Sequence, residues 1–225
     1  MHVGDLGQLL PLAVGSIISP LPIVAIVAIL LSPRGRVNGL AFAGATTAVG
    51  AVFTMIAAVT TAGAGAGHFD GDDTVVLVLT AALFLGFIVL AWLSWRSRPR
   101  NGAEPKTPSW LAAVDSLTPL KAAGLGALMA ATNSKNIPIE LKAGSLIGAH
   151  DLPLLMVILL SVLFAVVAAL GVLLPTALAA SGSQTVARGL TRLKTEMVRH
   201  NAVIMTVLFA ILASVEGAHL IHQLA

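Results

Sequence analysis

The sequence predicts an all-α integral membrane protein with six transmembrane helices. Of its 225 residues, 57% are hydrophobic and 10% are charged, and the mean hydropathy is +0.94. A helix needs about 20 apolar residues to cross about 30 Å of hydrocarbon. Six runs meet that requirement and leave almost no chain for a soluble domain: 6–31, 37–62, 74–95, 120–149, 153–180 and 198–222.

The distribution of lysine and arginine predicts which connections face the cytoplasm. The second and fourth connections and both termini contain neither residue. Under the positive-inside rule the other connections are cytoplasmic, so we expect both termini to be extracytoplasmic. The basic residues behind this prediction are Arg34 and Arg36 in the first connection, Arg96, Arg98, Arg100 and Lys106 in the third, and Arg188, Arg192 and Lys194 in the fifth.

The same topology predicts a 3+3 inverted repeat, because the first helix then starts outside and the fourth starts inside. The stretch "PIVAIVAILLS" (22–32) aligns with "PIELKAGSLIG" (138–148). We therefore expect a first repeat at 1–95, a cytoplasmic linker at 96–118 and a second repeat at 119–225. An apolar stripe at helical spacing predicts an interfacial amphipathic segment at 184–197: Val186, Leu190, Leu193 and Met197.

The first predicted helix carries a break at Ser19, Pro20 and Pro22. Both prolines lack an N–H, so carbonyls between residues 15 and 18 are expected to lose their helical partners. Such a break is tolerated only where it faces protein or a water-filled cavity. A pair of broken helices indicates a transport site, whereas a single break is also explained by a packing kink.

The fourth predicted helix carries a second, charged break. Lys135 and Glu140 each cost a few kcal/mol near a bilayer centre, so they are expected to face the protein interior with partners. One interpretation is a structural Lys135–Glu140 ion pair. The other has Lys135 present a fixed cation to an anionic group, with Glu140 as partner or proton carrier. The half-helix after Pro138 would then direct free N–H groups at the break. The proposed binding residues here are Asn133, Ser134, Lys135, Asn136, Pro138 and Glu140.

Glu216, in the sixth predicted helix, is a second candidate proton carrier. Its place near the outward end of that helix is also compatible with simple exposure to water.

The stretches "SPLPIVAIVAILLSPRGRVNGLAFAGA" (19–45) and "ATNSKNIPIELKAGSLIG" (131–148) resemble the LysE superfamily of exporters. Within it they are most similar to the Gap/Sap branch, the glycopeptidolipid- and sulfolipid-addressing proteins. The resemblance implies a dimeric bacterial inner-membrane protein that moves envelope lipids or glycolipids outward, beside a larger lipid exporter. LysE-type amino-acid exporters carry Gly-Pro near the first break. This chain has Ser19-Pro20-Leu21-Pro22, which argues against an amino-acid substrate.

Together these features predict a transporter or flippase for an anionic lipid or envelope glycolipid. The alternatives are an amino-acid or cation exporter and a non-transporting accessory subunit. Nucleophile-elbow, phosphate-loop and dinucleotide motifs are absent, so we expect no enzymatic activity. The chain has no cysteine, and its outer histidines and carboxylates are explained by solvated loops. We therefore expect no metal or other cofactor, and no nucleic-acid partner.

Overall fold

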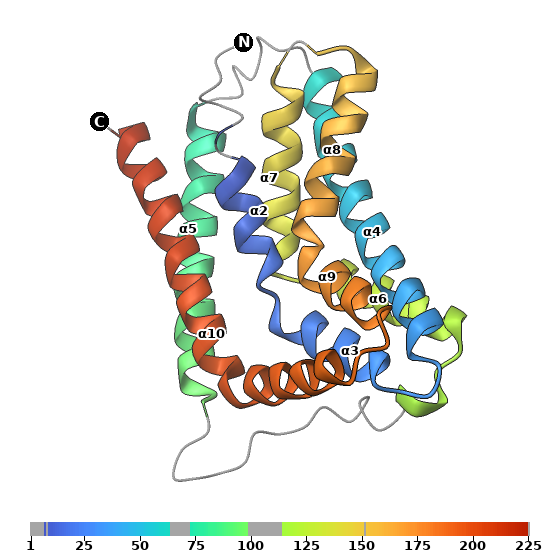
Figure 1. Cartoon of the computed structure of the whole chain (residues 1–225). Coiled ribbons are helices and arrows are strands. Elements are labelled where there is room, and N and C mark those ends of the chain that lie inside the picture. The colour runs from blue at the N-terminus through green and yellow to red at the C-terminus, as the bar shows by residue number, and fades with distance from the viewer. Residues whose placement is uncertain (1–6, 8, 64–72, 99–113, 151, 225) are drawn as a thin grey trace. The chain divides into compact units, whose positions relative to one another are not determined.

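The computed structural model describes residues 7, 9–63, 73–98, 114–150 and 152–224, and these form helices and short connections without a strand (Figure 1). The described residues of each predicted apolar run are helical apart from short breaks. The predicted linker at 96–118 lies largely outside the described residues. The helices are α2 (Leu9–Ile17), α3 (Pro20–Leu30), α4 (Gly35–Gly63), α5 (Asp73–Arg96), α6 (Pro119–Ala131), α7 (Asn136–Gly148), α8 (Leu154–Ala168), α9 (Leu170–Ala179) and α10 (Gln184–Leu224).

Several helices are long and apolar enough to cross a membrane. Among the described residues, α4 and α10 meet this test alone. The pairs α2–α3 and α8–α9 meet it as bent pairs, with angles of 52° and 66°. Two to four spans therefore follow from length and composition, which supports a membrane protein. The six-span topology and the outward termini stay predictions.

The chain forms two compact units, one of Met1–Ala66 with Lys106–Val198 and one of Gly67–Pro105 with Arg199–Ala225. The first unit holds α2–α4, α6–α9 and the start of α10, and the second holds α5 and the rest of α10. Each predicted three-helix half contributes its first two runs to the first unit and its last run to the second. This division is compatible with an internal repeat, which itself stays a prediction.

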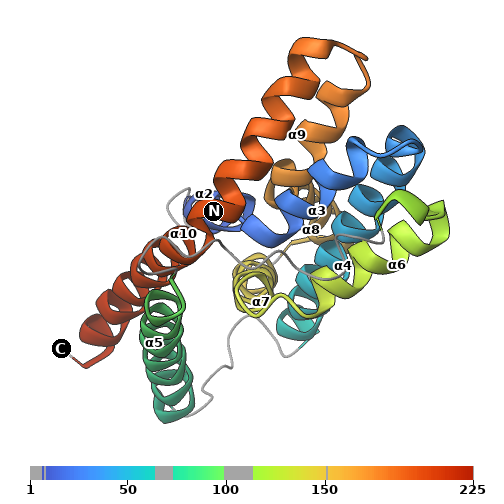
Figure 2. The ribbon, with the colours of Figure 1, turned by 90° about the horizontal axis from the view of Figure 1, so that it is seen from below.

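Helix α3 forms the centre of the first unit. It is apolar all round, as expected of a helix buried on every side, and it packs against α4, α6 and α9 (Figures 1 and 2). Leu190 is buried in the same core, and Val186 and Met197 pack against it. The predicted amphipathic segment at 184–197 lies within helix α10, and three residues of its apolar stripe contact this core, whereas Leu193 is 37% exposed.

Helix α4 packs very closely against α6 and α7 through glycines. A Cβ at Gly126 would lie 2.5 Å from the Phe42 carbonyl oxygen. A Cβ at Gly144 or Gly148 would overlap the carbonyl oxygen of Thr54 or Ala58. Small residues permit this approach between membrane helices. The contact fixes the position of α7, and with it the charged break that precedes α7.

The second unit is held by aromatic packing between its two helices. The rings of Phe87 and Phe209 lie 6.2 Å apart at an interplanar angle of 24°. Ala213 completes this buried cluster, and Gly217 leaves room for the ring of Phe84.

Candidate functional site

Three helix breaks meet inside the first unit. They separate α2 from α3, α6 from α7, and α8 from α9. A cavity of about 30 Å³ lies where they meet. Its lining combines polar residues of the first two breaks with small residues of the third: Ser16, Ile17, Ser19, Pro22, Ile23, Thr46, Gly50, Ala130, Asn133, Asn136, Glu140, Ala165, Ala168, Ala169, Gly171 and Val172.

The prolines of the first break start a new helix. Pro20 and Pro22 occupy the first and third positions of α3, where a missing N–H costs nothing. Because Pro22 has no N–H, the carbonyl of Ile18 has no donor within α3. The Ser19 N–H donates to Ile17 O, so the Gly15 carbonyl also lacks its helical donor. The predicted loss of helical partners is thus confirmed.

Lys135 supplies the missing donor from the second break. Its Nζ donates to Gly15 O at 2.6 Å and to Ile18 O at 2.9 Å, and the residue is only 1% exposed. The carboxyl end of α2 is the negative end of a helix dipole and favours a cation. Among the described residues, the ammonium is therefore held by two carbonyls, and no salt bridge joins it to Glu140.

Asn133 connects the first two breaks. Its Nδ2 donates to Ser19 Oγ at 3.0 Å. Its Oδ1 accepts from the N–H groups of Lys135 and Asn136, both at 3.2 Å. The expectation that free N–H groups face this break is therefore wrong, because Asn133 uses them. Pro138 is the third residue of α7, where its missing N–H leaves no hydrogen bond broken.

Glu140 lies on the opposite wall of the cavity, against α4. Its Oε1 is 3.0 Å from the position that a Cβ at Gly50 would take, so the glycine makes room for the carboxylate. Three polar atoms of the lining are buried without a hydrogen-bond partner among the described residues: Ser16 Oγ, Asn136 Oδ1 and Glu140 Oε2. The cavity matches the volume of about one water molecule, which commonly makes about three hydrogen bonds.

The structure thus brings together most of the predicted binding residues. Ser19, Pro22, Asn133, Asn136 and Glu140 line the cavity, and Lys135 bridges the breaks beside it. Pro20 is fully buried at the start of α3. Four predicted residues do not line the cavity: Lys135 and Pro20, just described, Ser134, which is exposed, and Pro138, which is half-buried. Glu216 lies in the second unit, buried and 3.8 Å from His219 Nδ1.

The third break was not predicted from the sequence. The run 153–180 is predominantly apolar and uncharged, yet α8 ends at Ala168 and α9 begins at Leu170. A Cβ at Gly171 would overlap the carbonyl oxygen of Ile17, so the start of α9 packs directly on the first break. Two residues of the run carried a signal: Gly171 itself, and Pro175, which cannot donate to the Gly171 carbonyl.

The hydrogen bond between Ser19 and Asn133 should couple the two breaks energetically. Replacing each residue by alanine, singly and together, should give a coupling of about 0.5–3 kcal/mol in a double-mutant cycle of thermal unfolding. The pair Thr60→Ala and Asn133→Ala serves as a matched control, because Thr60 bonds only within α4 among the described residues. Additive effects of the Ser19 and Asn133 replacements would show that the two breaks are not linked here.

A protein-family model described as Sap, sulfolipid-1-addressing protein, matches residues 9–222. This range includes all three breaks and every residue that lines the cavity. No curated protein and no solved structure matches the chain.

Proposed function

The chain belongs to the Sap, sulfolipid-1-addressing protein family, and from this we propose that it is a transporter that moves an anionic envelope lipid across the inner membrane. The family description supports a role in lipid addressing. The junction of broken helices supports transport by this chain itself, because breaks at membrane depth are characteristic of substrate and ion sites in transporters.

The observation that carries the proposal is the bridge from Lys135 to the carboxyl end of α2. The bridge places a buried cation on two backbone carbonyls that other ligands could replace. Ligand sites commonly measure about 300–1,000 Å³, whereas this cavity measures about 30 Å³. We therefore assign the described conformation to a closed state. Opening would separate α2 from the second break and let Lys135 exchange its carbonyls for an anionic headgroup.

Glu140 is the proposed proton carrier. It is buried beside the cavity, and Lys135 is the charged group that acts on it electrostatically. Intramembrane carboxylates of this kind form proton relays in pumps and transporters. Glu216 remains a second candidate in the other unit. As partners of the chain we propose the transported lipid, a second copy of the chain and a larger lipid exporter.

Neutralising Glu140 should uncouple transport from the proton gradient. Glu140→Gln keeps the shape of the side chain but cannot ionise. The transport rate of this variant should therefore be the same with an imposed pH gradient of either sign as it is without a gradient. Glu196→Gln, at an exposed position of α10, is the matched control and should respond as wild type does. An unaltered response in Glu140→Gln would remove Glu140 from the mechanism.

The experiment for the function itself is reconstitution of the purified chain alone into liposomes. Transbilayer movement of fluorescent phosphatidylglycerol and of a sulfated glycolipid is measured, with phosphatidylcholine as the neutral comparison. We expect movement of the anionic lipids only. Absence of movement by the folded chain would favour the accessory role, and efflux of an amino acid or cation without lipid movement would favour a solute exporter.

A further inference from the structure

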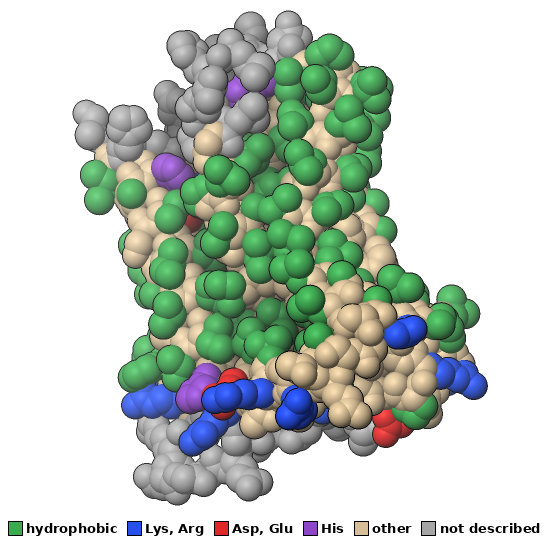
Figure 3. Space-filling model, in the orientation of Figure 1, with side chains coloured by type: hydrophobic (Ala, Val, Ile, Leu, Met, Phe, Trp, Pro, Cys, Tyr) green, Lys and Arg blue, Asp and Glu red, His purple; other side chains and the backbone are tan. Residues whose placement is uncertain are grey.

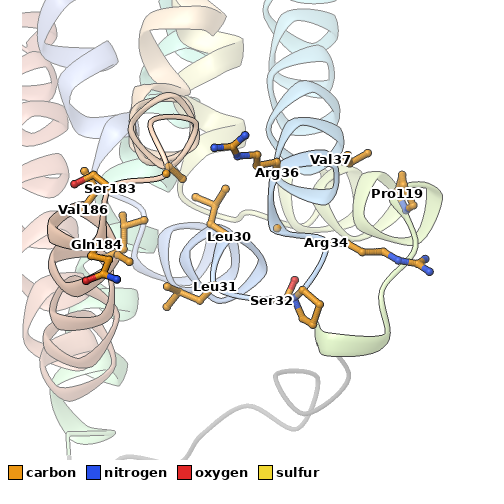
Figure 4. Close-up of a pocket in the computed structure, with 16 residues that line it drawn as sticks. Leu30, Leu31, Ser32, Arg34, Arg36, Val37, Pro119, Ser183, Gln184 and Val186 are labelled. Atoms are coloured by element: carbon orange, nitrogen blue, oxygen red, sulfur yellow. The ribbon is translucent and has the colours of Figure 1, made fainter.

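A second, larger pocket lies in the first unit, apart from the junction. Its volume is about 760 Å³, and it is formed where the α3–α4 connection meets the α9–α10 connection (Figure 4). The residues that matter for its chemistry are Leu30, Leu31, Arg34, Arg36, Val186 and Leu190. None of these residues lines the cavity where the three helix breaks meet. The volume lies within the range of small-molecule and lipid-headgroup sites.

The charge of the pocket is uniformly positive. Its lining includes Arg34 and Arg36 and contains no aspartate or glutamate. Arg36 extends from α4 toward the α9–α10 connection, and Arg34 extends toward Pro119 (Figure 4). Figure 3 shows a view in which hydrophobic side chains predominate and most of the visible lysines and arginines lie toward the bottom. A cationic pocket without carboxylates fits an anionic group.

The guanidinium of Arg36 is held in place while most of its donors remain available. Its Nη2 donates to Ala180 O at the end of α9, at 3.0 Å. This is one of five N–H donors, and the other four make no hydrogen bond within the described part of the chain. Gly182, with φ of 68°, lies beside the same Nη2, and a Cβ there would approach it to 3.1 Å. The left-handed glycine thus keeps side-chain bulk away from the guanidinium.

The apolar part of the lining determines what kind of anion fits. Leu30 ends α3 and Leu31 follows it, whereas Val186 and Leu190 lie in the first two turns of α10. All four line the pocket together with the two arginines. A free phosphate or sulfate would gain nothing from these side chains. A lipid gains from both parts, because its headgroup meets the arginines while its acyl chains meet the apolar wall.

We propose that this pocket binds the headgroup of an anionic lipid from the cytoplasmic leaflet. Basic pockets between membrane helices on the cytoplasmic side hold anionic headgroups. The two arginines of this pocket belong to the first predicted connection, which the positive-inside rule places on the cytoplasmic side. The site deepens the proposed function. It rests on that function in one respect only, namely that the lipid bound here is also the lipid transported. At this site the lipid would bind first, before it reaches the closed cavity where the three helix breaks meet.

The test measures binding, so that it does not depend on transport. Delipidated wild-type chain in detergent is titrated with phosphatidylglycerol or phosphatidylcholine, and bound lipid is counted by native mass spectrometry. The variant Arg34→Gln/Arg36→Gln should weaken phosphatidylglycerol binding at least about tenfold. The matched control Arg188→Gln/Arg192→Gln removes the same charge from exposed positions of α10 and should bind as wild type.

A second variant covers the case in which loss of Arg36 disturbs α9. Ser183→Asp places a carboxylate in the pocket lining and keeps a residue type preferred before a helix. It should weaken binding to a similar extent while the chain folds normally. Equal phosphatidylglycerol binding in wild type and Ser183→Asp would overturn the site, even if transport were normal.

Displacement of the lipid by inorganic phosphate would overturn the assignment to a lipid. Normal lipid binding in a chain that does not transport would overturn the proposed function and leave this site standing.

Discussion

Lys135→Met is expected to abolish lipid transport and to lower the thermal unfolding temperature by about 5 °C or more. Methionine keeps much of the volume of lysine but cannot donate, so two partly buried carbonyls at the end of α2 lose their only side-chain partner among the described residues. Each unsatisfied buried group costs about 1–3 kcal/mol. Transport is lost for a second reason, because no cation remains to bind the anionic headgroup.

Two further variants separate these effects. Lys135→Arg keeps the charge in a different geometry, so it should retain part of the transport activity. Lys142→Met removes a lysine from the same helix but outside the cavity lining, and it should transport normally. Normal transport by a correctly folded Lys135→Met chain would contradict the proposed role of the bridge. A lower unfolding temperature with normal transport would make the bridge purely structural.

Gly144→Leu is expected to prevent folding of the first unit. A side chain at this position would collide with the main chain of α4 at Thr54 and with Ala57, and backbone cannot move aside as a flexible side chain can. Overpacking costs about 1–3 kcal/mol in a core that can adjust, and here α7 would have to leave α4. We expect the yield of monodisperse protein in size-exclusion chromatography to fall at least about tenfold.

The matched control for this prediction is Gly124→Leu in α6. Nothing lies within 4 Å of a Cβ at Gly124, so the same substitution should leave the yield near that of wild type. If both variants behave alike, the loss reflects leucine in place of glycine in a membrane helix. The close approach of α4 and α7 would then not be what holds the unit together.

The sequence predicted the helical fold and two of the three breaks because each rests on local chemistry. Proline removes an N–H wherever it occurs, so Pro20, Pro22 and Pro138 indicated where helices change direction. The charges of the second break were recognised because lysine and glutamate are costly in an apolar segment. The third break, at Ala169, lies in a run without charged residues, where Gly171 and Pro175 were the local signals.

The contacts of the site depend on tertiary structure and could not be predicted. Lys135 and Glu140 lie five residues apart in the sequence, so an ion pair was one of the two interpretations, but Lys135 instead contacts Gly15, 120 residues away. The same limit applies to Arg36, which was interpreted only as a topology signal. Its approach to Ala180, 144 residues away, follows from the packing of α9 beside α3 and α4.

The measurement that tests the central claim most directly is the distance between α2 and α7 during transport. The chain has no cysteine, so Val14→Cys and Leu141→Cys, at exposed positions, place one spin label on each helix without background. Double electron–electron resonance is recorded in liposomes shown to transport the anionic lipid. We predict that adding this lipid shifts part of the distance distribution to longer values, and that Lys135→Met removes the response. A single, unchanged distance in actively transporting liposomes would contradict the account.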